Sequence, residues 1–234
     1  MNDATAPAYP LRGASVLLAG ASGGLGAALA VQLHQRGATI TLVGRDAGRL
    51  DAVPVPGVRR QLDLRTMEAC TAAVAAAHAV TGQLDVVINA VGVVAFGPVT
   101  DLSVDAMEEL FLTNTFLPIM LAKAALGVMG EGGALVNISG VIAEQNLPGM
   151  AAYGASKAAL RSFDDALGRE ARRAKIRVLD ARPPHTETGL ATRPISGAAP
   201  RMPVGLAPAF VAAVICDAIE QGTTDLPSTA FMPS

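Results

Sequence analysis

The sequence predicts one α/β domain in which a doubly wound parallel sheet is covered by helices on both faces, giving three layers. Three observations predict this fold class. Short apolar runs alternate with longer runs of helical spacing along the 234 residues. The apolar runs are continuous, as in strands that are buried on both faces. No linker, repeat or low-complexity tract divides the chain.

The first half of the chain contains four predicted strands and three predicted helices. The strands are short and rich in aliphatic or β-branched residues, and they lie at 15–19, 39–43, 58–62 and 84–90. The helices lie at 25–36, 67–80 and 104–126, and Gly37 and Gly82 end the first two. Pro118 lies inside the third helix and predicts a kink, because proline supplies no N–H and clashes with the preceding turn.

The second half continues the alternation. The run ALVNI predicts a strand at 134–138, and IRVLDA predicts another at 176–181. Helical spacing predicts helices at 151–173 and 206–220, and 224–231 is expected to form a short edge strand. Residues 182–205, rich in Pro and Gly, have no periodicity. A long connection of this kind in a compact domain is typical of a lid over a site.

Composition limits the class of protein. A formal net charge of −2 and a pI of about 5.9 give no reason to expect a nucleic acid partner. Cys70 and Cys216 lack metal-ligand spacing and are expected to be buried free thiols in a reducing, cytoplasmic setting. Residues 1–12 lack the apolar core of a signal peptide and are expected to form a flexible tail before a domain at 13–234. No charge-free apolar run reaches about 18 residues, so no membrane segment is expected.

The first predicted strand runs into GASGGLG, residues 20–26, and then into a helix. At such a turn the free N–H groups and the helix dipole face a bound anion, and glycine lets a phosphate approach the backbone closely. The preceding strand and the following amphipathic helix distinguish a dinucleotide site from a plain tight turn. We therefore expect a dinucleotide to bind at this end of the sheet.

Tyr153 and Lys157 lie four residues apart on a predicted helix, so their side chains share one face. A lysine cation beside a phenol stabilises the phenolate and lowers a pKa that starts near ~10. Such a tyrosine can exchange a proton with a substrate oxygen near neutral pH. The pair alone is a weak signal, because the same spacing occurs on many solvated helices.

Several motifs occur in the order typical of the short-chain dehydrogenase/reductase family, which the chain resembles from about residue 16 to residue 188. They are a glycine pattern similar to T-G-x-x-x-G-x-G (Gly20, Gly24, Gly26), an N-A-G-like segment (89–92), a helix asparagine (Asn114), an active-site strand (136–139) and a catalytic pair (Tyr153, Lys157). The resemblance implies a Rossmann-type fold, an NAD(P)-dependent oxidoreductase and a homodimer or homotetramer.

The resemblance also implies roles for individual residues. Tyr153 would exchange the proton of the substrate oxygen, Lys157 would lower the Tyr153 pKa and bind the nicotinamide ribose, and Asn114 would hold a water beside Lys157. In the alternative, Asn114 satisfies backbone groups near Pro118. The residues expected to contact or support the cofactor are Gly20, Ser22, Gly24, Leu25, Gly26, Arg45, Asp63, Leu64, Asn89, Ala90, Gly92, Tyr153, Lys157, Pro183 and Thr188.

Two positions depart from the family pattern. An ungapped match puts Gly140 at the position of the catalytic serine, and Ser139 lies one residue earlier. Successive side chains of a strand face opposite sides. Ser139 therefore either turns inward and acts as a catalytic residue, or points away and leaves the site without the family's hydroxyl. In the second case Gln145 or Asn146 could supply a polar group in its place. Pro184 replaces a glycine after the sixth strand and removes an N–H there.

The end of the second predicted strand bears on the choice of cofactor. A carboxylate there would bind the ribose 2′-OH of NAD, but the position is Gly44 and is followed by Arg45. The planar guanidinium suits the 2′-phosphate of NADP, which is favoured over NAD. In the alternative, Arg45 is a solvated turn residue, and Asp46 either caps the next helix or turns inward and favours NAD. Asp63 either contacts the adenine amine or caps the helix near Thr66.

The substrate is expected to be a neutral ketone or secondary alcohol, since no metal-binding motif is present in the sequence. Arg193 and Arg201 in the lid leave room for an anionic group, and His185 is either a pocket residue or an exposed lid residue. Six apolar residues are expected to wall the pocket or to pack in the core and lid: Val94, Phe96, Leu147, Met150, Leu190 and Met202.

The sequence thus predicts hydride transfer between NADP(H) and a small carbonyl compound or alcohol, with Tyr153 as general acid or base. A second hypothesis, motivated by Gly140 and Pro184, is an NADP-binding sensor or assembly protein with little turnover. An epimerase or dehydratase on a related fold is least favoured, because such relatives carry a longer substrate domain.

Overall fold

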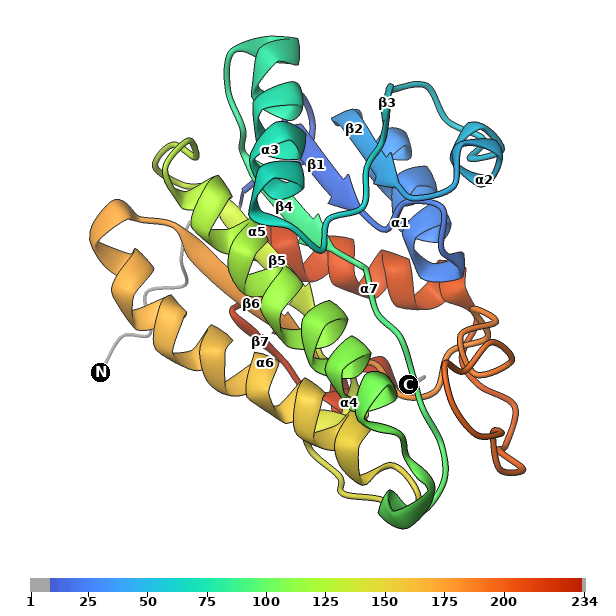
Figure 1. The fold of residues 1–234 in the computed structure, drawn as a ribbon. Helices are drawn as coiled ribbons and strands as arrows, with labels where there is room; N and C mark the ends of the chain where they lie inside the picture. Colours follow the sequence, from blue (N-terminus) through green and yellow to red (C-terminus); the bar gives the residue numbers. More distant parts are fainter. Residues whose placement is uncertain (1–8, 233–234) are drawn as a thin grey trace.

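A parallel sheet of seven strands forms the centre of the computed structural model, which describes residues 9–232 (Figure 1). The strands are β1 (Ser15–Ala19), β2 (Thr39–Gly44), β3 (Val58–Gln61), β4 (Val86–Asn89), β5 (Ala134–Ile138), β6 (Arg177–Ala181) and β7 (Asp225–Leu226). Their order across the sheet is β3-β2-β1-β4-β5-β6-β7. The order reverses between β1 and β4, which is where doubly wound sheets bind ligands, at the carboxyl ends of the strands. The predicted fold class is confirmed.

Helices cover both faces of the sheet (Figure 1). On one face Leu29 and Leu33 of α1 and Ile215 of α7 are fully buried against β1, β2, β4 and β5. On the other face, apolar residues of α3, α5 and the end of α6 form a second core cluster. The helices are α1 (Gly24–Gln35), α2 (Ala47–Asp51), α3 (Met67–Thr81), α4 (Val104–Phe111), α5 (Leu117–Leu126), α6 (Ala151–Glu170) and α7 (Pro208–Gln221), with short turns η1 (Val99–Asp101), η3 (Val141–Ala143), η4 (Ala171–Ala174) and η5 (Ser228–Phe231).

The predicted tail at 1–12 needs a correction. Residues 1–8 lie outside the described part of the chain, but Leu11 is fully buried in the core cluster with α1 and α7. The Tyr9 N–H donates to the Glu220 carbonyl at 3.0 Å, and the Arg177 guanidinium lies 5.4 Å from the centre of the Tyr9 ring. Burial of an apolar side chain and a cation–π contact therefore attach 9–12 to the domain. The predicted edge strand at 224–231 shortens to β7 followed by η5.

The predicted helix at 104–126 is continuous, but its middle is a π-helical segment, η2 (Leu112–Phe116), between α4 and α5. By length and composition this helix would be able to cross a membrane, yet half of its most apolar stretch is buried inside the protein. The π segment ends just before Pro118, where the missing N–H would leave a gap in a regular helix. A π-helical segment thus precedes the proline at which a kink was predicted, and η2 buries the side chains of Thr113, Asn114 and Thr115.

An ion cluster around Arg182 fixes the carboxyl edge of the sheet. This side chain is only 2% exposed, and its guanidinium contacts Asp180 of β6 at 2.6 Å and Asp225 of β7 at 2.6 Å. It also donates to Glu144, in the loop after η3, and Glu144 accepts from Ser228 at 2.6 Å. Removing one partner of such a buried pair costs about 3–5 kcal/mol, because the other charge is left uncompensated. The cluster therefore ties the loop after β5 to the far edge of the sheet.

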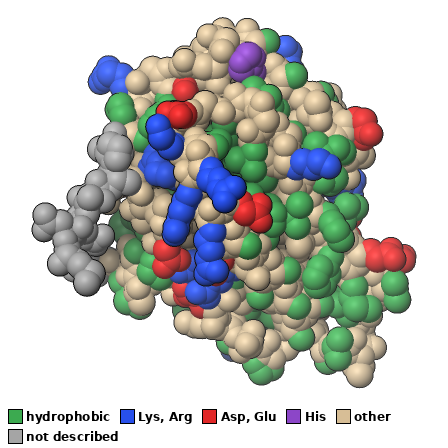
Figure 2. Space-filling model, turned by 90° about the vertical axis from the view of Figure 1, so that its left-hand side faces the viewer, with side chains coloured by type: hydrophobic (Ala, Val, Ile, Leu, Met, Phe, Trp, Pro, Cys, Tyr) green, Lys and Arg blue, Asp and Glu red, His purple; other side chains and the backbone are tan. Residues whose placement is uncertain are grey.

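The end of α6 lies at the left of the molecule in Figure 1, and Figure 2 shows that side. Lys and Arg side chains gather there with acidic side chains between them, beside an area of hydrophobic side chains. Arg169, Arg172, Arg173 and Lys175 are exposed at the end of α6 and in η4. Cations at this position complement the negative end of the helix dipole.

Candidate active site

A cavity of about 1040 Å³ lies at the carboxyl ends of β1, β2, β4 and β5. Fourteen of the predicted site residues line it: Gly20, Ser22, Gly24, Leu25, Arg45, Asp63, Leu64, Ala90, Gly92, Ser139, Tyr153, Lys157, Pro183 and Thr188. The other three, Gly26, Asn89 and Asn114, are not among the residues that line it. The folded chain thus brings the glycine loop and the Tyr153–Lys157 pair to one cavity.

The glycine loop packs so closely against its surroundings that side chains are excluded at three positions. A Cβ on Gly26 would lie 2.1 Å from the Gly20 carbonyl oxygen, and one on Gly24 would lie 2.5 Å from the Thr188 carbonyl oxygen. Gly20 has a φ of +79° and meets the backbone of Ala90. No side chain caps the start of α1, and Gly23, Gly24 and Leu25 line the cavity, so the first N–H groups of this helix are available to a bound anion. The loop fits a bound pyrophosphate.

Lys157 joins α6 to the end of β5. Its ammonium donates to the Ile138 carbonyl at 2.8 Å, and the side chain is 5% exposed. Tyr153, one turn earlier, is half-buried and faces the same cavity. A Cβ on Gly92 would lie 3.4 Å from both Lys157 Nζ and Asn114 Oδ1. Gly92 is therefore the position at which these two polar groups approach each other.

The pKa values differ from the sequence-based expectation. Burial raises the pKa of Tyr153 to about 12, whereas Lys157 was expected to lower it. Burial also lowers the pKa of Lys157 to about 8, against the opposing charges of Asp180 and Asp164. The reason is geometric: the Lys157 ammonium is buried against the Ile138 carbonyl, and the Tyr153 side chain is partly removed from water. The phenol is consequently protonated at neutral pH.

Asn114 holds the segment after β4. Its Nδ2 donates to the Val93 carbonyl at 2.9 Å and to Ser156 Oγ at 3.0 Å, and its Oδ1 accepts from the Val93 N–H at 3.0 Å. Its backbone partner is thus Val93 rather than a group near Pro118. Asn89 contributes in a similar way, donating to Asn137 Oδ1 at 3.2 Å and accepting from the Val91 N–H at 3.2 Å.

Ser139 does not turn its hydroxyl toward the cavity. The side chain is fully buried, and Oγ donates to Asp180 beneath α6. Gly140 follows with a φ of +81°, and the nearest atom to an added Cβ is the Pro183 carbonyl oxygen at 3.8 Å. Gln145 and Asn146 are exposed and do not line the cavity, so neither substitutes for the hydroxyl. Of the two expected outcomes, the structure has the one without a serine donor.

Two carboxylates near the end of β2 are already engaged. Asp46 Oδ1 accepts from the Arg49 N–H at 2.9 Å, which is the expected cap of α2. Asp63 is held by Arg65, with Nε at 2.9 Å from Oδ1, and this bond lowers the Asp63 pKa. The cap of α3 is Thr66, so of the two roles considered for Asp63 the helix cap is excluded.

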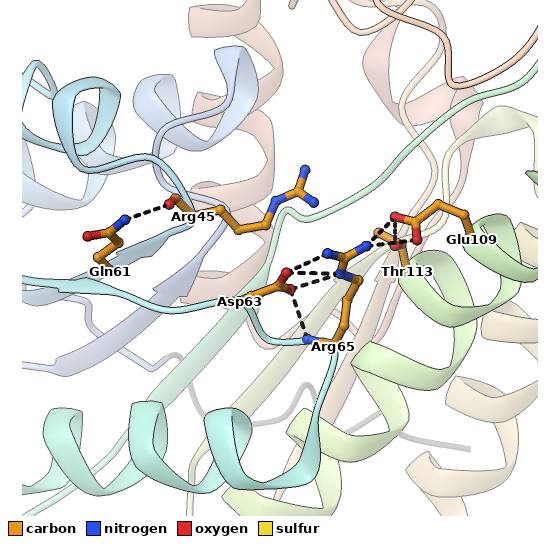
Figure 3. Close-up of polar contacts among 6 residues, drawn as sticks. All are labelled: Arg45, Gln61, Asp63, Arg65, Glu109 and Thr113. Atoms are coloured by element: carbon orange, nitrogen blue, oxygen red, sulfur yellow. Dashed lines mark hydrogen bonds and ion pairs between the residues drawn. The ribbon is translucent and has the colours of Figure 1, made fainter.

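Figure 3 shows that Arg65 continues from Asp63 to Glu109 of α4, at 2.8 Å, while Arg45 lies apart. The Arg45 carbonyl accepts from Gln61 at 3.1 Å. Within residues 9–232 its guanidinium forms no hydrogen bond or ion pair (Figure 3), and Arg45 is one of the residues that line the cavity. Glu109 is a partner that sequence reasoning missed, because no local pattern indicates a contact across 44 residues.

Most of the remaining residues that were expected in the pocket line the cavity. All six apolar candidates line the cavity, as does His185, while Arg193 lines it and Arg201 does not. Pro184 supplies no N–H, and the carbonyl of the preceding Pro183 accepts from the Val141 N–H at 3.0 Å. In the part of the chain that the structure describes, no group of three or more His, Cys, Asp or Glu could hold a metal ion.

Comparisons with known proteins agree with this geometry. The sequence pattern of the short chain dehydrogenase family matches residues 14–196. Dehydrogenase/reductase SDR family member 7B of Mus musculus is 32% identical over 96% of this chain and 76% of that protein. A short chain dehydrogenase from Burkholderia cenocepacia J2315 in complex with NADP has a TM-score of 0.83 at 27% identity, over 96% of this chain and 100% of that one. One from Burkholderia phymatum in complex with NAD has a TM-score of 0.84 at 21% identity, over 94% and 90%, a likeness of fold alone.

The buried ammonium of Lys157 predicts a dependence of stability on pH. Its pKa is lowered from 10.5 to about 8, so the unfolded chain binds this proton more strongly between those two values. The penalty is therefore full below pH 8 and is relieved as the pH rises toward 10.5. We expect the free energy of unfolding of Lys157→Met to exceed that of wild type most at neutral pH, and we expect this difference to shrink as the pH rises.

Urea unfolding from about pH 7 to about pH 10 measures the difference in the free energy of unfolding. Lys123→Met is the control, because Lys123 is exposed and should leave the pH dependence of wild type unchanged. A constant difference between Lys157→Met and wild type across the range contradicts the prediction.

Proposed function

The chain belongs to the short chain dehydrogenase family of oxidoreductases, and we propose that it transfers a hydride between NADP(H) and a neutral ketone or secondary alcohol. One observation carries the proposal: Tyr153 and Lys157 line the same cavity as the glycine loop. A nicotinamide dinucleotide bound at that loop supplies or accepts the hydride. The apolar cavity wall supports a substrate without charge.

Tyr153 acts as the general acid in the reducing direction. The phenol is protonated at neutral pH and so has a proton to give to the carbonyl oxygen, while its raised pKa in the free protein makes it a weaker acid than an exposed tyrosine. Lys157 places a positive charge on the same helix face and orients the ribose. The water implied beside Asn114 remains a prediction. The buried amide of Asn114 already has hydrogen-bond partners in Val93 and Ser156, so its burial does not require a water.

Arg45 supports NADP as the preferred cofactor. The nearby carboxylates of Asp46 and Asp63 are engaged in a helix cap and an ion pair, so neither is free to select the 2′-OH of NAD. The guanidinium beside them lies at the end of β2, where a 2′-phosphate is expected in this fold. The relative from Burkholderia cenocepacia in complex with NADP supports the same preference.

We further propose a cytoplasmic homodimer or homotetramer. The outer side of the helix from 104 to 126 exposes large apolar side chains, Phe116 at 57% and Val104 at 63%, which supports subunit contacts. Cys70 and Cys216 are buried free thiols, as a reducing compartment allows. Light scattering should give two or four times the chain mass of 23.7 kDa; a monomer at micromolar concentration contradicts this proposal.

The general-acid role of Tyr153 predicts a specific loss of catalysis. With NADPH and a panel of ketones, we expect Tyr153→Phe to lower kcat by about 10²–10⁴-fold while the Kd for NADPH changes by less than about threefold. Tyr9→Phe, the change of the one other tyrosine, is the control. Tight NADPH binding by wild type, with no turnover of any ketone and no effect of Tyr153→Phe, would instead favour a sensor or assembly protein.

The engagement of Ser139 with Asp180 predicts that its hydroxyl does not take part in the reaction. We expect Ser139→Ala to keep kcat within about threefold and to lower the free energy of unfolding by about 1–3 kcal/mol, because a buried carboxylate loses a donor. A catalytic hydroxyl would instead cost about 10²–10³-fold in kcat. Ser162→Ala, at an exposed position of α6, is the matched control.

The position of Arg45 predicts the direction of a cofactor switch. We expect Arg45→Ala to raise the Kd for NADP⁺ by about 10–100-fold and to leave the Kd for NAD⁺ within about threefold, because one charge-assisted phosphate contact is lost. Arg60→Ala is the control, since Arg60 is exposed on β3 away from the cavity lining. Equal effects on both nucleotides would exclude a 2′-phosphate contact.

A further inference from the structure

The lid is attached to the loop that follows β4. The Ile195 N–H donates to the Val94 carbonyl at 2.9 Å, and the Phe96 N–H donates to the Ser196 carbonyl at 3.0 Å. These two segments approach so closely that a Cβ on Gly197 would lie 1.8 Å from the Phe96 carbonyl oxygen. In Figure 1 the lid is the orange segment beside one end of α1. The backbone around Arg193 is therefore held in place over the cavity.

A second contact brings the lid to the glycine loop. The Thr188 carbonyl oxygen lies 2.5 Å from the position of a Cβ on Gly24, and Arg193 folds back onto this carbonyl. Arg193 Nε donates to the Gly189 carbonyl at 2.9 Å, and its Nη2 donates to the Thr188 carbonyl at 3.5 Å. The guanidinium thus lies beside the start of α1, and it lines the same cavity as Gly23 and Gly24.

Charge decides what this guanidinium can bind. Within residues 9–232 Arg193 forms no ion pair, and the bonds of its Nε and Nη2 to backbone carbonyls leave its charge uncompensated. The uncapped N–H groups of α1 and the positive end of the helix dipole attract an anion to the same place. A planar guanidinium can donate two N–H bonds at once to the oxygens of a phosphate.

We infer that Arg193 binds the pyrophosphate of the dinucleotide from the lid side, opposite the N–H groups of the glycine loop. This inference rests on the proposed function, because it assigns a residue to the cofactor site of that reaction. It also gives Arg193 a role other than contact with an anionic substrate, since the guanidinium is held beside Thr188 and Gly24. Cofactor binding and the position of the lid are then linked through one side chain.

Titration calorimetry with NADP⁺ and NAD⁺ tests the inference, because both nucleotides carry the pyrophosphate. Arg193→Ala should raise both Kd values by the same factor, about tenfold, and Arg193→Lys should restore part of the affinity by keeping the charge. Both losses should diminish at high salt. Arg201→Ala is the matched control, an exposed lid arginine that does not line the cavity, and should leave both Kd values unchanged.

Each other outcome overturns a defined statement. Unchanged Kd values in Arg193→Ala, or a loss for NADP⁺ alone, reject the pyrophosphate contact, while turnover of a ketone by wild type with NADPH upholds the proposed function. A raised KM for an anionic carbonyl substrate with unchanged Kd values assigns Arg193 to the substrate instead. Wild type that binds neither nucleotide rejects the proposed function and the inference together. A purely structural role of Arg193 has a different signature. The thermal midpoint of Arg193→Ala would then lie well below those of Arg193→Lys and Arg201→Ala, while all three variants would have the same Kd values for the nucleotides.

Discussion

The hydrogen bond from the Lys157 ammonium to the Ile138 carbonyl sets the position of the reactive groups. It attaches α6 to the end of β5 at 2.8 Å, and Tyr153 lies one turn earlier on the same helix face. A buried ammonium needs such an acceptor, because an unpaired charge would be expelled from the interior. The same burial lowers the pKa of Lys157 and raises that of Tyr153, so near neutral pH the pair reaches the cavity as a neutral phenol beside a mostly protonated ammonium.

Electrostatics in the cofactor cleft follow from which charges are already paired. Asp46 is committed to the cap of α2, and Asp63 to Arg65, which extends the pair to Glu109 on α4. These pairings remove negative charge from the cleft and leave the guanidinium groups of Arg45 and Arg193 facing it. Together with the N–H groups at the start of α1, they form a surface suited to a ligand with several phosphates.

Ser139 shows how a structural demand can take a residue away from chemistry. Its hydroxyl donates to Asp180, and the same carboxylate forms an ion pair with Arg182. Arg182 in turn connects β6, β7 and the loop after η3. A buried carboxylate is costly without donors, so this hydroxyl stabilises the carboxyl edge of the sheet. Gly140 follows it, at the position that the sequence comparison predicted for the serine of the family. With a φ of +81° it turns the chain toward the lid without presenting a donor side chain.

Local sequence patterns determined the strands, most helices, the glycine loop and the shared face of Tyr153 and Lys157, because periodicity, turn residues and close backbone packing act over a few neighbouring residues. Tertiary structure decided what those patterns contact. Three contacts depend on segments far apart in the chain: the Arg65–Glu109 ion pair, the hydrogen bond from the Ser139 hydroxyl to Asp180, and the burial of Leu11. The sign of the Tyr153 pKa shift was decided in the same way, since desolvation depends on everything packed around a group, and a lysine four residues away is only one part of that surrounding.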